Sequence, residues 1–451
     1  MTRCTWMAAL AVVALAGCGE NLATKERLPA DGGGGSGGGG GAPGGPTWHQ
    51  DVQPIVARSC EGCHTPGAIA PFALRTWEEA RPWHDAMRLA VESRTMPPWL
   101  AGPGCNEYRH DPSLTQEEID TIVAWSLAGA PEGEPATPVP PAPIGGLDRV
   151  DRELEMPEAY TPRQHPDDYR CFLLDWPEEE LSFITGFQAV PGAPTEVHHV
   201  IAFLIEPDLV DDAEARDAAE EGPGWTCFAG PGVGSGANSF RWLGAWAPGS
   251  TGADFPAGTG LRMEPGSKIA LQVHYNTLTA GATPDRTRVQ FKVARQVESE
   301  AIVVPFTNPN WLRGDAMAIP AGEADVRYAW SFPLSLYVAG LGGEAGPLLL
   351  HAAALHLHQL GTRASIRIDR AEDACVLEIP RWDFHWQSIF DLRQPIRIEP
   401  GEEVILECHW DNTPENQMVV DGARLPAQDV AWGEGTRDEM CLGILYVTPA
   451  E

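Results

Sequence analysis

Apolar and polar positions follow two different periods along this chain. Residues 51–64 and 114–129 repeat apolar side chains at helical spacing, and Thr115 stands where a helix N-cap is expected. Residues 195–205, 268–277 and 348–361 are instead apolar runs typical of β-strands. Helical periodicity is otherwise scarce, while glycine (48) and proline (41) are abundant. The pattern therefore predicts a small helical domain followed by β-rich domains.

The N-terminal segment is typical of an export signal. In residues 1–17, Arg3 precedes an apolar run at residues 7–16, which is too short to span a bilayer. Residues 15–18 read LAGC and resemble a bacterial lipobox, which implies an acylated Cys18 and an envelope lipoprotein. Gly19 rather than Asp follows, so we expect the outer membrane, facing the periplasm or the cell surface. An ordinary signal peptide with a chance cysteine is the alternative.

Composition narrows the possible partners. The length of 451 residues allows roughly three domains at about 150 residues each. A hydrophobic content of 43% with 16 tryptophans excludes a disordered chain. The net charge of −32 would repel a phosphate backbone, so no nucleic-acid partner is expected. Residues 18–46 are interpreted as a lipidated, glycine-rich tether, so contact with the membrane is expected through the lipid anchor only.

Residues 60–64 read CEGCH and match the pattern of covalent c-type haem attachment. Cys60 and Cys63 would form the thioethers, and His64 would bind the iron. A redox cysteine pair or half of a zinc site is the alternative. Met96, in a proline-stiffened loop, is the expected sixth ligand, whereas Met87 lies in a helical pattern and is interpreted as packing. This order of elements resembles a small class I-like cytochrome c domain, which we place at residues 47–131.

A proline-rich spacer at residues 132–146 separates this module from two further domains, expected at residues 147–298 and 299–451. The histidines of these domains gather in three strand-like runs. His198 and His199 are adjacent, so they can bind one metal ion only if the strand bulges there. His274 lies in the second run. In the third run, alternation places His356 and His358 on one face of a strand and His351 on the other.

Each histidine taken alone is more often structural than a ligand, but the ordered set is more specific. The segments HHV, QVHYN and HLHQLG, followed by Asp-Glu-Met-Cys at residues 438–441, resemble the copper type II, ascorbate-dependent monooxygenases. Residues 244–249, GAWAPG, are also similar to a segment of that family. The resemblance spans roughly residues 150–448 and implies two β-sandwich (jelly-roll) domains, each with one copper ion, on opposite sides of a solvent-filled cleft.

The resemblance also implies roles for individual residues. His198, His199 and His274 would hold the first copper, which transfers electrons. His356, His358 and Met440 would hold the second, where O2 binds and the C–H bond is broken. The family's peptide-amidating branch anchors a substrate carboxylate at three positions that are here occupied by apolar residues, namely Ala354, Leu442 and Ile444. A C-terminal glycyl peptide is therefore not expected as substrate.

The cysteines divide by role. Cys408 with Cys441 matches a disulfide of the resembled family and would hold the strand that carries Met440. The remaining four cysteines, Cys105, Cys171, Cys227 and Cys375, are not paired by the sequence, although Cys171–Cys227 is the second expected pair.

The expected fold is thus multidomain, a small all-α cytochrome c-like domain followed by two all-β copper domains. The expected function is hydroxylation of a small organic substrate with O2, with electrons from ascorbate or another redox partner, by way of the haem. The expected cofactors are two copper ions and one covalently bound c-type haem. Two alternatives stay open: a non-catalytic electron-transfer or copper-binding lipoprotein on this scaffold, and a zinc hydrolase with an electron-transfer domain attached.

Overall fold

The structure is a computed structural model that describes residues 44–66, 70–142, 145–228, 230–234, 241–247, 252–277, 281–313, 316–371, 374–420 and 422–450. The expected signal at residues 1–17, the lipid site Cys18 and most of the tether lie outside the described residues. Among the helices that are described, none is long and apolar enough to cross a membrane.

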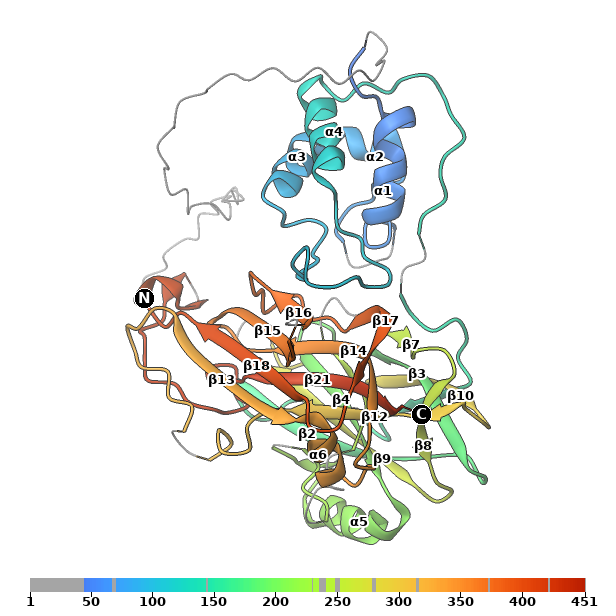
Figure 1. Cartoon of the computed structure of the whole chain (residues 1–451), viewed down its shortest axis with the longest axis vertical. Coiled ribbons are helices and arrows are strands. Elements are labelled where there is room, and N and C mark those ends of the chain that lie inside the picture. Colours follow the sequence, from blue (N-terminus) through green and yellow to red (C-terminus); the bar gives the residue numbers. More distant parts are fainter. Residues whose placement is uncertain are drawn as a thin grey trace, which may run out of the picture. The chain divides into compact units, whose positions relative to one another are not determined.

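The helical part has its own hydrophobic core. Trp48, Val52, Ile122 and Trp125 are almost completely buried in it, and the two indole rings lie 5.6 Å apart. The last helix begins with the predicted N-cap, because Thr115 accepts from the backbone N–H of Glu118 in a capping box. Figure 1 labels α1 (Gln53–Ser59), α2 (Trp77–Ala80), α3 (His84–Glu92) and α4 (Gln116–Leu127). Two short helical turns, η1 (Trp48–Val52) and η2 (Arg81–Trp83), complete the helical part.

Two sheets form the first β-domain. The strand order of one sheet is β5-β2-β9-β4-β6, and that of the other is β1-β10-β3-β8-β11, with β7 paired to β3. Phe172 and Leu271 of the first sheet share a core with Ile184 and Phe291 of the second, as in a β-sandwich. The strands are β1 (Arg152–Glu155), β2 (Asp167–Asp175), β3 (Ser182–Val190), β4 (Val197–Ile205), β5 (Trp225–Thr226), β6 (Trp242–Trp246), β7 (Ala253–Asp254), β8 (Thr259–Met263), β9 (Lys268–Asn276), β10 (Arg288–Ala294) and β11 (Ser299–Glu300).

A second sandwich follows in the chain. One sheet has the order β12-β21-β14-β17 and the other β13-β18-β15-β16, and Leu350 and Leu445 pack between them against Ile366 and Leu406. The strands are β12 (Ile302–Phe306), β13 (Val326–Pro333), β14 (Leu348–His356), β15 (Gly361–Asp369), β16 (Ala374–Ile379), β17 (Phe390–Ile398), β18 (Glu403–Trp410) and β21 (Leu442–Pro449). Smaller elements are η3 (Pro207–Leu209), α5 (Val210–Ala219), α6 (Leu334–Gly340), η5 (Pro414–Asn416), β19 (Val419–Val420) and β20 (Ala423–Arg424).

The sandwiches also contact each other. The hydroxyls of Thr259 on β8 and Tyr446 on β21 lie 2.8 Å apart, and Ala352 and Tyr446 of the second sandwich belong to the hydrophobic core of the first. Residues 45–451 accordingly cluster as one unit by their contacts. The expectation of two β-domains agrees with the structure, but they share buried side chains instead of meeting only through a linker.

Two segments differ from the sequence-based interpretation. The described part of the proline-rich spacer hydrogen-bonds to α1, because the amide side chain of Gln53 satisfies both backbone groups of Val139. Residues 99–109, placed by sequence in the helical module, pack into the core of the second sandwich, where Tyr108 is buried. A long-range disulfide, Cys105–Cys375, holds this segment there.

Three disulfides are present among the described residues. Cys408–Cys441 and Cys171–Cys227 are the two pairs expected from sequence, and Cys105–Cys375 is the pair that sequence left open. Cys60 and Cys63 are free thiols among the described cysteines.

Candidate metal centre

Three imidazoles from two neighbouring strands converge in the first sandwich. His198 and His199 lie on β4 and His274 on β9, and the register of these strands shifts between Val197 and His199. This irregularity is the bulge that adjacent histidines require, because it turns both rings toward His274. The Nδ1 atom of His199 lies 3.4 Å from that of His198 and 3.3 Å from that of His274. The three histidines each offer one ligand atom within 4.8 Å of the other two, which is close enough for one metal ion.

Protein groups fix the orientation of His274. Its Nε2 atom lies 2.9 Å from the Asp167 carboxylate, and its ring stacks on Tyr169 with the centroids 4.0 Å apart. With Nε2 engaged by the carboxylate, Nδ1 faces the other two imidazoles. Such a carboxylate–histidine pair is typical of metal-binding histidines.

The second pair of imidazoles lies at the end of β14. His356 is the last residue of the strand, His358 follows it, and their rings are 5.0 Å apart. The Nδ1 of His356 lies 2.6 Å from Oε1 of Gln387, and the Nδ1 of His358 lies 2.9 Å from the carbonyl oxygen of Asp438. Both Nε2 atoms therefore remain available to one ion. His351 takes no part, because it contacts the hydroxyl of Thr448 instead.

Met440 stands beside a buried carboxylate that holds the second pair in place. Glu439 accepts hydrogen bonds from the backbone N–H of His358 and Leu360, and from the indole of Trp410. Burial raises the pKa of Glu439 to about 7, against those hydrogen bonds. Cys441, the residue after Met440, is joined to β18 by the disulfide with Cys408. Met440 therefore lies between two anchored residues, Glu439 and Cys441.

The two groups of histidines are neighbours. The rings of His199 and His356 lie 6.4 Å apart. Phe384 stacks on His198 with the centroids 4.8 Å apart, and it lies 6.1 Å from the ring of His358. This corrects the expectation of two metal sites separated by a solvent-filled cleft, because aromatic rings are in contact where the cleft was expected.

The electrostatic surroundings suit metal binding. Burial lowers the pKa of His198 and His199 well below its usual value, and it lowers the pKa of His358 to about 3. The imidazoles are therefore neutral at neutral pH and can donate lone pairs without first losing a proton. An all-imidazole set and an imidazole set near a thioether are donor sets that copper accepts in either oxidation state.

The CxxCH segment follows α1. The Nδ1 atom of His64 lies 3.1 Å from the carbonyl oxygen of Phe72, which leaves Nε2 free for a ligand. Met87 is buried in the helical core, in agreement with its interpretation as packing, whereas Met96 is 37% exposed in the loop after α3. Nothing in the described contacts joins Met96 to His64.

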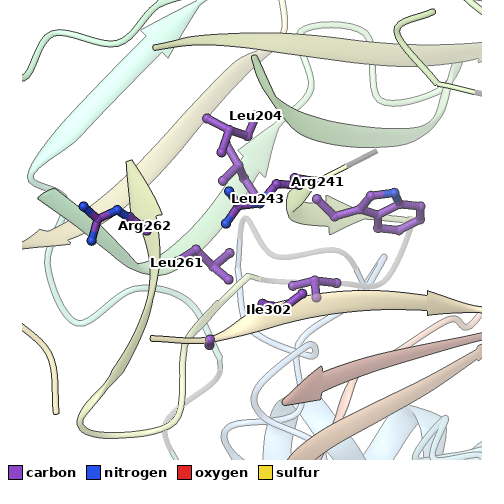
Figure 2. A pocket seen from close by; sticks show the side chains of 9 residues that line it. Leu204, Arg241, Leu243, Leu261, Arg262 and Ile302 are labelled. Carbon is purple, nitrogen blue, oxygen red and sulfur yellow. The ribbon is translucent and has the colours of Figure 1, made fainter. Parts of the chain in front are cut away.

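One small pocket lies where β4, β6, β8 and β12 meet (Figure 2). Its labelled side chains are those of Leu204, Arg241, Leu243, Leu261, Arg262 and Ile302. The pocket has room for about one water molecule, and none of its lining residues is a candidate metal ligand.

Comparison with known proteins identifies the class. Residues 152–281 match the N-terminal domain of the copper type II ascorbate-dependent monooxygenases, and residues 314–450 match the C-terminal domain. The two matches together cover more than half of the chain, which therefore belongs to this family.

Individual relatives agree with that assignment. The chain is 25% identical to DBH-like monooxygenase protein 1 of Gallus gallus over 331 residues, 69% of this chain and 48% of the relative. It is 23% identical to tyramine beta-hydroxylase of Caenorhabditis briggsae (71% of this chain, 52% of the relative) and 24% identical to dopamine beta-hydroxylase of Bos taurus (70% and 49%). The chain thus spans about half the length of these relatives.

The histidines are evident in the sequence, whereas the groups that orient them are not. Asp167 lies 107 residues before His274, and Gln387 lies 31 residues after His356, so no local pattern connects either pair. The one available signal was the aromatic run at residues 382–386, WDFHW, which is unusual for an exposed loop.

Proposed function

We propose that this chain is a copper-dependent monooxygenase that hydroxylates a C–H bond of a small organic substrate with O2. The observation that carries the proposal is the convergence of two imidazole sets, in which protein groups engage the second ring nitrogen of His274, His356 and His358. Family membership supports copper as the metal and monooxygenation as the reaction class. The reaction balances as substrate, O2, two electrons and two protons giving the alcohol and water.

Bound copper would supply the one-electron steps and the activation of O2. His198, His199 and His274 would hold one ion. His356, His358 and Met440 would hold the other. The protein's own contribution is orientation: Gln387 and the Asp438 carbonyl engage the Nδ1 atoms of the second pair, and so direct Nε2 toward the ion.

The surroundings of His356 support an apolar substrate. Ala354 pairs with Ile444, and His356 pairs with Leu442, on the adjacent strands β14 and β21. Ala354, Leu442 and Ile444 stand at the three positions at which the peptide-amidating branch would anchor a carboxylate. Because Ala354 and Leu442 are also buried, no charged anchor stands at this place.

A covalently bound c-type haem in the helical module is the second part of the proposal. Burial raises the pKa of Cys60 to about 12 and also raises that of Cys63, whereas cysteines of a redox CxxC pair have lowered pKa values. Both thiols are free although every other described cysteine is paired. Thioethers to haem, with His64 on the iron and Met96 as the other ligand, account for both observations.

The proposed location is the bacterial cell envelope, with the protein anchored by lipid on Cys18 to the outer membrane. Three disulfides support an oxidising compartment, because disulfides are rare in the reducing cytosol. Incorporation of a labelled fatty acid, lost on Cys18→Ser, tests the anchor.

Oxygen uptake with product analysis tests the central proposal. With copper loaded and ascorbate as reductant, wild-type protein should consume O2 and hydroxylate members of a panel of small apolar amines and aromatics. Met440→Ile should lower turnover at least about 10-fold because the thioether is lost. Met418→Ile, the same change outside both metal sets, is the control.

Two outcomes would overturn the proposal. Uptake of O2 without any hydroxylated product would leave the electron-transfer or copper-binding alternative standing. Equal turnover of the Met440→Ile and Met418→Ile variants would remove Met440 from the second site. Metal analysis after anaerobic purification separates copper from the zinc-hydrolase alternative.

A further inference from the structure

One short segment of the second sandwich contacts both the loop that carries Met96 and the candidate copper ligands. This bridging segment, Arg381–Gln387 (RWDFHWQ), lies between β16 and β17. In length and position it is a normal connection between two strands, but its side chains contact residues of three other segments.

The first residue of the bridging segment contacts the helical part. The guanidinium of Arg381 donates to the carbonyl oxygen of Ser93 at 3.2 Å and to that of Arg94 at 2.7 Å. Arg94 is two residues before Met96, the proposed haem ligand. Two hydrogen bonds from one planar guanidinium fix the direction as well as the distance of this contact.

The following residues contact the histidines. Trp382 is 7% exposed, and its indole N–H donates to the carbonyl oxygen of His358 at 3.0 Å. Phe384 stacks on the ring of His198 at an interplanar angle of 23°. At the far end, the Gln387 side chain holds His356. The bridging segment therefore touches three of the five candidate imidazole ligands.

Residues just after the Met96 loop pack against the second sandwich and keep the loop close to it. Trp99 lies edge-on to Phe390 with the centroids 4.9 Å apart, and the hydroxyl of Tyr108 donates to the carbonyl oxygen of Val376. The Cys105–Cys375 disulfide closes the same contact covalently. These contacts fix the chain after the Met96 loop against the second sandwich. The two Arg381 hydrogen bonds therefore join segments that are already held together.

We propose that Arg381 and Trp382 form the route by which electrons pass from the haem of the helical module to the second copper site. The route runs from the backbone of Arg94 through the guanidinium of Arg381, along the chain to Trp382, and across its indole hydrogen bond to His358. It consists of covalent bonds and two hydrogen bonds. Electrons tunnel more efficiently along such a path than across empty space.

The electron balance is simple, and this inference rests on the proposed function. In each transfer one ferrous haem becomes ferric and one cupric ion becomes cuprous, and an external one-electron donor reduces the haem again. Two transfers supply the two electrons that one hydroxylation needs. Entry at His358 means that the haem reaches the site where O2 reacts without first passing through the His198, His199 and His274 set.

Stopped-flow absorbance tests the route in the intact, copper-loaded protein. Ferrous haem is mixed with O2, and its reoxidation is followed in the presence and absence of copper. Trp382→Phe removes the indole donor and keeps an aromatic ring, and we expect copper-dependent reoxidation to slow at least about 10-fold. Trp386→Phe, the same change four residues away in the bridging segment, is the matched control and should behave as wild type.

Further readouts separate the route from a general loss of structure. The haem absorbance spectrum, the haem midpoint potential, the copper content and the ascorbate-driven turnover of Trp382→Phe should all match those of the Trp386→Phe control. Arg381→Ala should reproduce the slow reoxidation because it breaks the contact at the other end of the route.

The outcomes distinguish the two proposals. If reoxidation is copper-dependent in the wild type and equally fast in Trp382→Phe and Arg381→Ala, only the route is overturned. If the haem of the wild type is reoxidised at the same rate with and without copper, the haem is not the electron donor and the route is overturned as well. Slow reoxidation with normal ascorbate-driven turnover is the expected result.

Discussion

The carboxylate of Asp167 connects the first imidazole set with the segment that leads to Met440. It accepts from Nε2 of His274 at 2.9 Å and from the hydroxyl of Thr436 at 2.6 Å, and its pKa is lowered overall because these hydrogen bonds outweigh its burial. Thr436 is four residues before Met440 in the chain. Asp167 of the first sandwich thus orients His274, a candidate ligand of the first set. It also holds the segment that leads to Met440 of the second set.

Replacement of that charge should weaken the first copper site. Asp167→Asn keeps the size but not the charge, so we expect copper affinity at this site to fall by about 10- to 100-fold, as for other groups that hold a metal-binding histidine. Competition against a chelator of known affinity measures it. Asp175→Asn, on the same strand but paired with Lys268 at the surface, should bind copper as the wild type does. Equal affinities of the two variants would contradict the role of Asp167.

Glu407 contributes a pH-dependent part of the stability. Hydrogen bonding to Arg327, against some desolvation and with help from His409, lowers the pKa of Glu407 from 4.5 to about 2. A lowered pKa in the folded state means that the contribution is complete above pH 4.5 and disappears as the pH falls toward 2. The pair is partly exposed, so the contribution is modest.

Glu407→Gln should therefore destabilise the protein by about 1 kcal/mol or less at pH 7 and have no effect near pH 2. Urea unfolding at the two pH values measures the difference. Glu403→Gln, on the same strand but bonded to the hydroxyl of Ser331, is the matched control at both pH values. A deficit of Glu407→Gln that persists at pH 2 would contradict the assignment.

The segment at residues 99–109 shows how one element can join parts of the chain that lie far apart in sequence. Its residues Ala101 and Tyr108 belong to the core of the second sandwich, and the backbone N–H of Gly102 donates to the carbonyl oxygen of Glu378 on β16. The Cys105–Cys375 disulfide joins residues separated by 270 positions. A disulfide that closes a loop of that length strongly reduces the conformational entropy of the unfolded chain.

Removal of this disulfide should loosen the segment without removing the metal sets. Cys105→Ser with Cys375→Ser should lower the free energy of unfolding by about 2–4 kcal/mol and expose residues 99–109 to limited proteolysis. Cys171→Ser with Cys227→Ser, within the first sandwich, is the matched control, and it should leave residues 99–109 protected. Protection of residues 99–109 in both double variants would contradict the docking.

The candidate copper ligands come from strands of both sandwiches, so metal binding and stability of the folded molecule are linked. Any ion that binds the folded chain and not the unfolded chain raises stability in proportion to the logarithm of its concentration. Copper loading should therefore raise the unfolding temperature, and a chelator should reverse the rise. A total copper content near two per chain is expected.

Differential scanning calorimetry with metal analysis checks this expectation. At a free copper concentration about 1,000 times the dissociation constant, the stabilisation should be about 4 kcal/mol for each bound ion. His274→Ala should lose one copper ion and part of the stabilisation. His351→Gln, a histidine outside both sets, should lose neither, and a loss of copper in this control would contradict the ligand assignment.

Several features could be predicted because they depend on neighbours in the sequence. The N-cap at Thr115 and the strand that carries His198 and His199 follow from local residue type and hydrophobic pattern, whereas the bulge was only the condition for both histidines to bind one ion. The strand that ends at His356 follows in the same way. The family resemblance then joined these segments into two β-domains with two candidate metal sets.

Other features depend on contacts between distant parts of the chain. Nothing near Asp167 or Gln387 in sequence points to the histidines that they orient, and nothing near Cys105 points to Cys375. The close approach of the two imidazole sets, with Phe384 between His198 and His358, replaced the expected open cleft.

The sequence by itself determined which residues could bind metal, which cysteines stand in a haem-attachment pattern, and that the chain would form β-domains after a helical part. These properties follow from residue chemistry and from hydrophobic periodicity over a few residues. The tertiary structure alone decided which nitrogen of His274, His356 and His358 is free, how near the two sets lie, and that Arg381 and Trp382 link the Met96 loop to His358. Those properties arise from the packing of strands and loops far apart in the chain, which no local pattern encodes.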